Sequence, residues 1–188
     1  MQQNARVVNS AFNTVTGAFY GAYASWELAH SREALERMLS TIDWLESEHL
    51  LLYASCDYGW IAHALVRSGE PARARIYVER ALRRASLGDL LGEAAAYRVL
   101  AELSASDDPA QSEQYLERAS EAGAQRGSRH EAVKTLLLRA ELALARGDHE
   151  QAQRWADESS ALAAELGMHW YVERARSLTT SEHVESAG

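Results

Sequence analysis

Large apolar residues recur at helical spacing along most of the chain. Tyr58, Ile61 and Leu65 follow one another at intervals of three and four positions, and Val78 and Leu82 continue the pattern in the next run. A period near 3.6 residues predicts amphipathic helices, each with one apolar face. The chain has only two prolines, and alanine, leucine, glutamate and arginine, which all favour helices, dominate it. These patterns predict an all-α fold.

One pattern of residues is repeated along the chain, and it is marked by a small residue, a glycine and a proline. A small residue inside each run recurs at separations of 40, 38 and 40 positions: Ala34, Ala74, Ser112 and Ala152. A glycine that follows the run recurs at separations of 39 and 40: Gly88, Gly127 and Gly167. Two prolines, Pro71 and Pro109, stand 38 apart, each three residues before its small residue. A repeating unit of about 40 residues follows.

Each marker has a structural reason to stand where it does. Proline is tolerated in the first helical turn, and Asp108 before Pro109 is a good N-cap. Glycine adopts the left-handed conformation that ends helices. The sequence "SRHE" from Ser128 to Glu131 fits a capping box. The unit is therefore predicted to be a hairpin of two helices.

One hairpin cannot bury both of its faces, whereas a stack of hairpins can. The spacing predicts one repeat domain over residues 1–180, followed by a frayed tail over 181–188. Its expected parts are four hairpins and a C-terminal capping helix: about 5–47, 48–87, 88–126, 127–166 and 168–180.

Two loops carry a resemblance to a known family. Gly147–Ala152 reads "GDHEQA" and Gly69–Ala74 reads "GEPARA", so both fit the loop pattern G-[DE]-x-x-x-A. This pattern resembles the tetratricopeptide repeat, although the period here is longer than the commonest form. The ending "AAELG" of Ala163–Gly167 is similar to the C-terminal helical arrays of large bacterial ATP-dependent transcription activators and multidomain adenylate cyclases. The resemblance implies a right-handed α-solenoid used for binding rather than for chemistry.

Charge and composition narrow the classes of partner. A formal net charge of -8 on 188 residues argues against a nucleic-acid surface, which needs a concentrated basic face. The arginines that do gather are interpreted as a solvated helix face: Arg73, Arg75, Arg80, Arg83 and Arg84. The lone Cys56 is expected to be a small core residue. No signal peptide or membrane-spanning run is recognised, so the chain is predicted to be cytoplasmic, with no membrane contact.

Motifs for catalysis or metal binding are not found in the sequence. It has neither a G-x-x-x-x-G-K-[ST] nor a G-x-G-x-x-G loop. The pairs His130–Glu131 and His149–Glu150 lack a second histidine one turn later, and the seven histidines are scattered. We therefore expect no metal, no cofactor and no catalytic residue. An acid–base pair formed by distant residues stays open, and an all-α enzyme is the third interpretation.

The first predicted helix, Val7–Ala29, stands apart from the others. It is almost uncharged and carries five of the fifteen aromatic residues: Phe12, Phe19, Tyr20, Tyr23 and Trp26. In one interpretation Phe19, Tyr23 and Trp26 pack on the second hairpin. In the other, part of the helix meets a preceding repeat, a ligand or a second copy of the chain. The last case predicts a homodimer through Phe12 and Tyr20.

The inner surface of such a solenoid is lined mainly by the first helix of each hairpin. Placing the repeats in register gives a predicted binding groove with an aromatic end and a charged end: Phe19, Tyr23, Trp26, His63, Arg67, Arg98, Glu102, Lys134, Leu137 and Glu141. The leading interpretation is a non-catalytic scaffold, adaptor or regulatory module that binds a peptide or protein segment in this groove. The alternative is a small-ligand sensor domain of a bacterial transcription activator.

Overall fold

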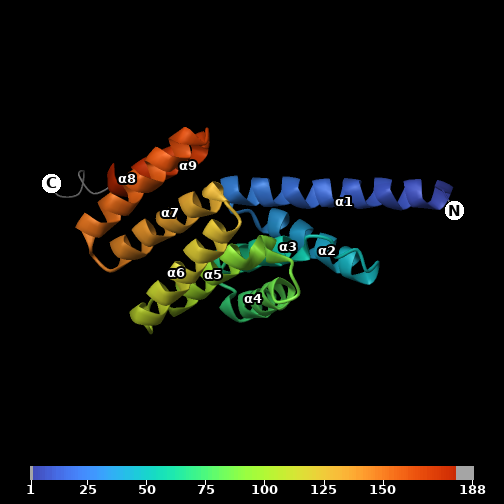
Figure 1. Ribbon diagram of the computed structural model, residues 1–188, viewed down its shortest axis with the longest axis horizontal. Coiled ribbons are helices and arrows are strands. Elements are labelled where there is room, and N and C mark those ends of the chain that lie inside the picture. Colours follow the sequence, from blue (N-terminus) through green and yellow to red (C-terminus); the bar gives the residue numbers. More distant parts are fainter. Residues whose placement is uncertain (1, 181–188) are drawn as a thin grey trace. The chain divides into compact units, whose positions relative to one another are not determined.

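The computed structural model describes the backbone of residues 2–180 and the side chains of residues 11–179 (Figure 1). Within these residues it contains nine α-helices, one short 3-10 turn and no strand, which confirms the all-α prediction. The tail predicted to fray, 181–188, lies outside the described residues. The chain divides into two compact units, Met1–Val99 and Leu100–Gly188, with the boundary inside one helix.

The first unit contains two helix hairpins and the segment that follows them. Its elements are α1 (Gln2–Ala29), α2 (Arg32–Ser47), α3 (Ala54–Arg67), α4 (Pro71–Ala85), the 3-10 turn η1 (Leu90–Gly92) and the first part of α5 (Glu93–Ser104). Helix α1 packs on α2, α3 packs on α4, and η1 packs on both α3 and α4. Helix α1 has 28 residues against 16 in α2, so its N-terminal part runs past the end of α2 (Figure 1).

The second unit begins with the end of α5 and contains four more helices. These are α6 (Pro109–Gln125), α7 (Arg129–Ala145), α8 (His149–Glu165) and α9 (His169–Thr180). Helix α7 packs on α6 and α8, and α9 packs mainly on α8. The bounds of α2 to α8 lie within the predicted hairpin ranges, α1 begins three residues before the first range, and α9 lies in the range predicted for the capping helix.

The repeat markers act at the helix ends largely as predicted. Pro71 and Pro109 are the first residues of α4 and α6. The Asp108 carboxylate accepts a 2.9 Å hydrogen bond from the backbone N–H of Gln111. Gly127, with φ +63°, adopts the left-handed conformation. The capping box predicted at Ser128 is wrong, because its side chain makes no cap hydrogen bond; its carbonyl oxygen accepts from the N–H of Glu131 at 3.0 Å instead.

The small residue that anchors each repeat is buried at a helix crossing. All four anchors are buried: Ala34, Ala74, Ser112 and Ala152. A small side chain lets two helix backbones approach closely, and larger residues fill the flanking space. The buried hydroxyl of Ser112 needs a hydrogen-bond partner, and it donates a 2.9 Å hydrogen bond to the carbonyl of Ala101 on α5. Ser159 of α8 does the same toward the carbonyl of Val133 on α7, at 3.0 Å.

Candidate functional site

The aromatic residues gather in the first unit, which holds eleven of the fifteen. Six rings pack between α1 and α3 and form what we call the aromatic cluster: Phe19, Tyr20, Tyr23, Trp26, Trp60 and His63. Trp60 is its centre. The Tyr23 ring stacks on it with centroids 4.4 Å apart and an interplanar angle of 5°, and the Tyr20 ring meets it edge-on at 5.5 Å. Such offset and edge-on contacts suit the charge distribution of aromatic rings.

This packing decides between the two interpretations of the first helix. Phe19, Tyr23 and Trp26 lie on one face of α1 and are buried against Trp60 and His63 of the second hairpin. The interpretation that these three side chains pack inward is therefore confirmed. Spacing of three and four residues places them on one helical face, and α3 supplies the surface that covers it.

Several residues of the predicted groove are consequently not on an open surface. Five of the ten predicted residues are buried, and the groove itself stays a prediction; the five are Phe19, Tyr23, Trp26, Arg98 and Leu137. The other members are half-buried, except for the exposed Arg67: His63, Glu102, Lys134 and Glu141. Helices α3 and α7 each pack against more than one neighbouring element, so helical register alone does not identify their exposed face.

Glu27 joins two of the predicted residues and was not predicted itself. Its Oε1 accepts a hydrogen bond from the Tyr23 hydroxyl and lies 3.4 Å from Nδ1 of His63. The interaction ties the end of α1 to the middle of α3. Its position in the sequence could have identified it, because Glu27 is the first charged residue after a long uncharged stretch and follows Tyr23 by one helical turn.

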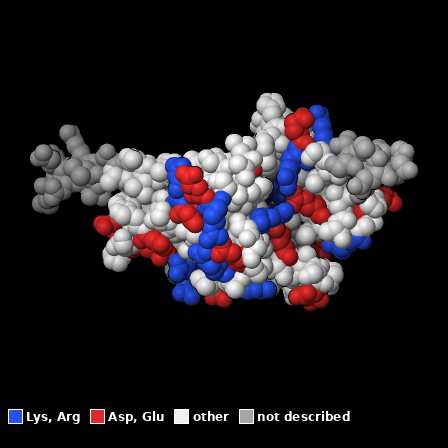
Figure 2. Space-filling view, turned by 180° about the vertical axis from the view of Figure 1, so that it is seen from behind, with Lys and Arg blue, Asp and Glu red and all other residues white. Residues whose placement is uncertain are grey.

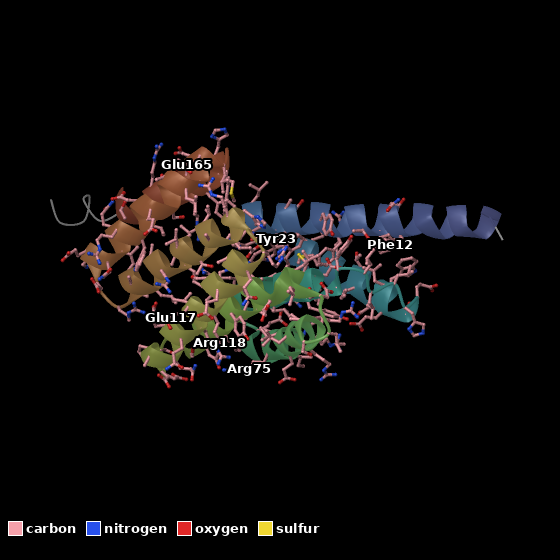
Figure 3. The ribbon with its side chains drawn as sticks, in the orientation of Figure 1. Phe12, Tyr23, Arg75, Glu117, Arg118 and Glu165 are labelled. Atoms are coloured by element: carbon pink, nitrogen blue, oxygen red, sulfur yellow. The ribbon has the colours of Figure 1, made fainter. Side chains whose placement is uncertain are left out.

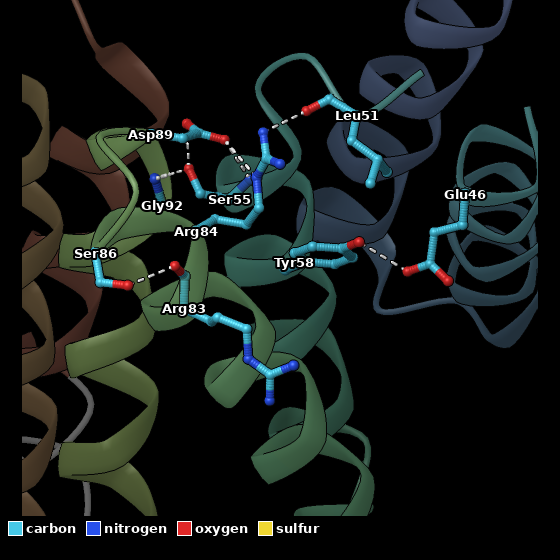
Figure 4. A network of polar contacts seen from close by, with 9 residues as sticks. All are labelled: Glu46, Leu51, Ser55, Tyr58, Arg83, Arg84, Ser86, Asp89 and Gly92. Carbon is cyan, nitrogen blue, oxygen red and sulfur yellow. Dashed lines mark hydrogen bonds and ion pairs between the residues drawn. The ribbon is translucent and has the colours of Figure 1, made fainter. Parts of the chain in front are cut away.

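A second polar structure holds the N-terminus of α3, and we call it the α3 clasp: Ser55, Arg84, Asp89 and Gly92 (Figure 4). The Asp89 carboxylate accepts from the N–H of Ser55 at 3.0 Å and from its hydroxyl at 2.6 Å. Ser55 Oγ in turn accepts from the N–H of Gly92 at 3.0 Å. Tyr53, the N-cap residue, makes no side-chain cap bond. Asp89, 34 residues away, therefore supplies the missing cap.

The clasp brings two backbones unusually close together. A Cβ placed on Gly92 would lie 1.8 Å from the carbonyl oxygen of Ser55. A Cβ placed on Gly59, one turn further along α3, would lie 3.0 Å from Cβ of Ala95. Both glycines are thus required by close approach. The first turn of α3 is held with little freedom to move away from the segment around η1.

Asp57, in that first turn, is the most unusual side chain of the structure. It is only 3% exposed, and its Oδ1 is buried without a hydrogen-bond partner among the described residues. Burial, and secondarily the charge of Asp89, raises the pKa of Asp57 from 3.8 to about 7. This burial was not predictable from the sequence, because an aspartate in the first turn of a helix is normally a solvated residue that interacts favourably with the helix dipole.

The surroundings of Asp57 join it to the aromatic cluster. Burial raises the pKa of the Tyr20 hydroxyl to about 12, with further contributions from the charges of Asp57, Cys56 and Tyr53. On α3, Asp57 and Trp60 are three residues apart and so lie on neighbouring parts of one helical face, and Tyr53 is the N-cap residue of the same helix. We call Tyr20, Tyr53, Asp57 and Trp60 the acidic aromatic site. Cys56, expected in the core, is half-buried beside it.

Part of this site is open to solvent. Tyr20 is 40% exposed and Tyr53 is 48% exposed, and Leu52, next to Tyr53, is 58% exposed. Phe12, two turns before Tyr20 on α1, is half-buried; Figure 3 shows Phe12 and Tyr23 along this helix. Of the two residues predicted to mediate self-association, Tyr20 is therefore well exposed and Phe12 partly so. Self-association itself stays a prediction.

The groove residues predicted in the second unit have partners within their own unit. Glu141 forms an ion pair with Arg174 of α9 at 3.0 Å. The Lys134 ammonium lies 5.9 Å from the centroid of the Tyr171 ring, also on α9. These contacts fasten α9 to α7 and account for the half-burial of both predicted residues.

Charged side chains of both signs are interleaved on the face shown in Figure 2. On α4, Arg80 pairs with Glu46 at 2.7 Å, Arg84 lies 3.4 Å from Asp89, and Arg73 pairs with Glu70. These pairs agree with the interpretation of the arginine cluster as a helix face with nearby carboxylates. Among the described residues, no group of three or more His, Cys, Asp or Glu side chains is placed to hold a metal ion. None of the described helices combines the length and apolarity needed to cross a membrane.

Comparison with known proteins adds no family to these observations. No protein-family model, curated protein or solved structure matches the chain. The resemblance to the tetratricopeptide repeat therefore depends on the residues alone, and membership of that family stays a prediction.

Proposed function

We propose that this chain is a non-catalytic module for protein–protein interaction, built as a right-handed α-solenoid of four hairpins resembling tetratricopeptide repeats. Three observations support the architecture. The repeat period is 38 to 40 residues, the helices form pairs within it, and the anchor residue of each repeat is buried. Repeat arrays of this kind present extended surfaces and serve mainly in binding.

One observation carries the functional part of the proposal, namely the exposed aromatic surface of the first unit. Tyr20 of α1 and Leu52 and Tyr53 of the α2–α3 connection are all well exposed, whereas the other aromatic side chains of the unit are buried or half-buried. Tyrosine offers a large apolar ring with a hydrogen-bonding end, and it is enriched in protein interfaces. We assign the partner contact to this surface rather than to a groove along all four hairpins.

A catalytic function is less well supported than binding. The carboxyl of Asp57 has a pKa near neutrality, as a general acid or base needs. Its nearest acidic neighbour, Asp89, is committed to Ser55 and Arg84. The clasp thus uses Asp89 to hold a helix end rather than as a partner of Asp57 in proton transfer.

Site-specific photocrosslinking in the native cell tests the proposal. A benzophenone amino acid is placed at Tyr20, at Tyr53 and, as a control, at Ile76 of α4, which is 50% exposed. We expect one protein to be captured from positions 20 and 53 and not from 76. The Tyr20→Glu variant should capture it at least tenfold less from position 53. Capture of the same mixture from all three positions would contradict the proposal.

A second copy of the chain is one partner that this surface suits. The N-terminal part of α1 runs past α2, and Phe12 and Tyr20 lie on the same side of that helix, eight residues apart. A two-fold contact would cover both copies with one self-complementary surface. Sedimentation between low and high micromolar concentration measures this directly. A dimer weakened by Phe12→Glu and Tyr20→Glu, with unchanged helical content, is the expected result; a monomer throughout would exclude it.

A further inference from the structure

The carboxyl of Asp57 is costly to keep where it is. Its Oδ1 has no contact with solvent and no hydrogen-bond partner in the described part of the chain. A buried polar group without a partner is normally selected against, because it loses its water without gaining a hydrogen bond. The surrounding structure is rigid, since Gly59 and Gly92 hold the backbones in close contact. Asp57 cannot relieve the cost by a small movement of its helix.

The charge that acts on Asp57 is negative. The segment between α4 and η1 presents Asp89, which is itself acidic and which, after burial, raises the pKa of Asp57. On α1, the Tyr20 hydroxyl lies within range of the charges of Asp57, Cys56 and Tyr53. Arg84 is bound to Asp89 and to the carbonyl of Leu51 at 2.8 Å. Asp57 is therefore buried beside a second carboxylate whose cation is already engaged.

The aromatic rings beside Asp57 favour the same kind of ligand. Tyr20 and Trp60 pack edge to face at 5.5 Å, and Tyr53 and Tyr20 are both exposed. The faces of aromatic rings carry partial negative charge and attract cations within about 6 Å. A carboxylate adjoining such rings is complementary to a planar guanidinium, which can stack on a ring and donate two hydrogen bonds to the carboxylate.

We propose that the acidic aromatic site binds an arginine side chain of the protein partner, with its guanidinium donating to Asp57 and stacked on the rings of Tyr20 or Trp60. The inference rests on the proposed function, since it specifies the chemistry of the partner at the same surface. Entry of the arginine requires the Tyr20 or Tyr53 ring to turn outward. Tyr20 and Tyr53 are 40% and 48% exposed, so either ring can turn toward solvent, Tyr20 at the cost of its edge contacts with Phe19 and Trp60.

The ligand supplies what the folded chain lacks. The guanidinium provides hydrogen-bond donors for the buried oxygen and a positive charge opposite Asp57 and Asp89. Binding therefore stabilises the ionised form of Asp57 relative to the protonated one. A neutral group of the same shape cannot do this. In the isolated chain, the buried oxygen without a hydrogen bond and the two neighbouring carboxylates are unfavourable. In the complex, the guanidinium compensates both, as expected of a recognition site that is completed by its ligand.

The test uses the whole chain and a small probe, N-acetyl-arginine methylamide. The carboxyl carbon of Asp57 and the ring signals of Tyr20 and Trp60 are followed by NMR as the probe is added. The matched neutral probe is the citrulline analogue, which has the same shape without the charge. We expect a saturable response to the arginine probe, at least tenfold weaker binding of the citrulline probe, and a fall of about one unit in the pKa of Asp57 at saturation.

Variants separate recognition from folding. Asp57→Asn keeps the shape of the side chain and should bind the arginine probe at least tenfold more weakly, while circular dichroism and thermal unfolding report that it is folded. Asp43→Asn, at an exposed position of α2, is the matched control and should bind normally. Equal binding of both probes, or an Asp57→Asn variant that binds as well as the unmodified chain, would overturn the arginine site.

The outcome can be separated from that of the proposed function. If Tyr20→Glu abolishes capture of the partner but Asp57→Asn does not, the interaction surface stands and the arginine site is wrong. If the arginine probe binds through Asp57 but no partner is captured from positions 20 and 53, the site stands and the proposed protein interaction is wrong.

Discussion

The two units use the same hairpin plan but differ in what they bury. The first unit contains eleven aromatic residues and the second contains four. The first is nearly balanced in charge, with ten arginines against eleven Asp and Glu residues, whereas the second has nine Lys and Arg residues against sixteen Asp and Glu residues. Most of the net charge of -8 therefore belongs to the second unit.

Buried polar groups show the contrast most clearly. In the second unit, the hydroxyls of Ser112 and Ser159 sit at helix crossings and donate to a carbonyl of the facing helix. In the first unit, Ser55 and Asp89 build a cap for α3, and the neighbouring Asp57 is left buried without a hydrogen bond to Oδ1. Local departures from ordinary packing rules concentrate where a protein has a function. Both units bury a carboxylate, Asp57 at 3% and Glu131 at 4% exposed, but Glu131 lies 3.2 Å from His130, whereas the charge that acts on Asp57 is that of another carboxylate, Asp89.

The largest expected difference between the units concerns glycine. Gly92→Ala places a Cβ within 1.8 Å of the Ser55 carbonyl oxygen, so the clasp has to open, and we expect a loss of about 5 kcal/mol or more in the free energy of unfolding. In the second unit, Gly123→Ala brings a Cβ to 3.3 Å from Cβ of Glu131. The cost of that close contact offsets the higher helix propensity of alanine, so the free energy of unfolding should change by no more than about 0.5 kcal/mol. Urea unfolding followed by circular dichroism measures both, and similar losses would mean that the clasp is not rigid.

The next prediction concerns pH. The pKa of Asp57 is raised from 3.8 in the unfolded chain to about 7 in the folded one, so the folded state holds this proton more tightly. The stabilisation is complete below pH about 4 and is lost progressively as the pH rises to about 7. Asp57→Asn should therefore match the unmodified chain near pH 4 and exceed its stability by about 4 kcal/mol at pH 8.

The control for this prediction lies in the second unit. Asp157 is exposed on α8, so Asp157→Asn should give a stability curve parallel to that of the unmodified chain. Chemical unfolding at pH 4, 6 and 8 measures the free energy of unfolding of the unmodified chain and of the two variants. An Asp57→Asn curve that also runs parallel would show that Asp57 is solvated and ionised throughout.

A smaller effect compares a distant helix cap with a local one. Asp89→Ala removes two hydrogen bonds to Ser55 and the ion pair with Arg84, and we expect a loss of about 2 kcal/mol. Asp148→Ala removes one local cap bond, from the N–H of Gln151 at 3.1 Å, and should cost about 1 kcal/mol. The stability of both variants is measured by thermal unfolding at pH 5, because Asp57 is mainly protonated at that pH. Equal losses would indicate that Asp89 contributes nothing beyond an ordinary cap.

The sequence predicted features that depend on residues close together in the chain. Pro71 and Pro109 began helices, Gly127 ended one, and Asp108 capped the helix that follows it. Helical spacing also showed that Phe19, Tyr23 and Trp26 share a face, which supported one of the two interpretations.

The candidate site was not predictable in the same way, because it depends on contacts between distant segments. Asp89 caps a helix that begins 35 positions earlier, and Asp57 is buried because Gly92 allows another backbone to approach α3. Neither relation leaves a local pattern. The burial of several residues predicted to line the groove has a related cause. Periodicity identifies the buried face of a helix, but a helix packed on two neighbours buries more of its circumference than one stripe.

The smallest expected effect compares one substitution, serine to alanine, at two buried positions. In the second unit, Ser112 stands where the other three repeats have alanine. Its partner, the carbonyl of Ala101, also accepts from the Ser104 hydroxyl at 3.3 Å, so Ser112→Ala leaves that oxygen with a donor. We expect a change within about 0.5 kcal/mol, because the lost hydrogen bond is offset by the removal of a buried hydroxyl.

In the first unit the same substitution should behave differently. Ser55→Ala removes the hydroxyl that both donates to Asp89 and accepts from the buried N–H of Gly92, which is left without that partner. An orphaned buried N–H costs about 1–3 kcal/mol, so Ser55→Ala should be clearly destabilising. Urea unfolding of the two variants at one pH compares them directly. If Ser112→Ala were as costly as Ser55→Ala, the hydroxyl of the third repeat would hold α5 and α6 together, and the contrast between a clasped first unit and an ordinarily packed second unit would not hold.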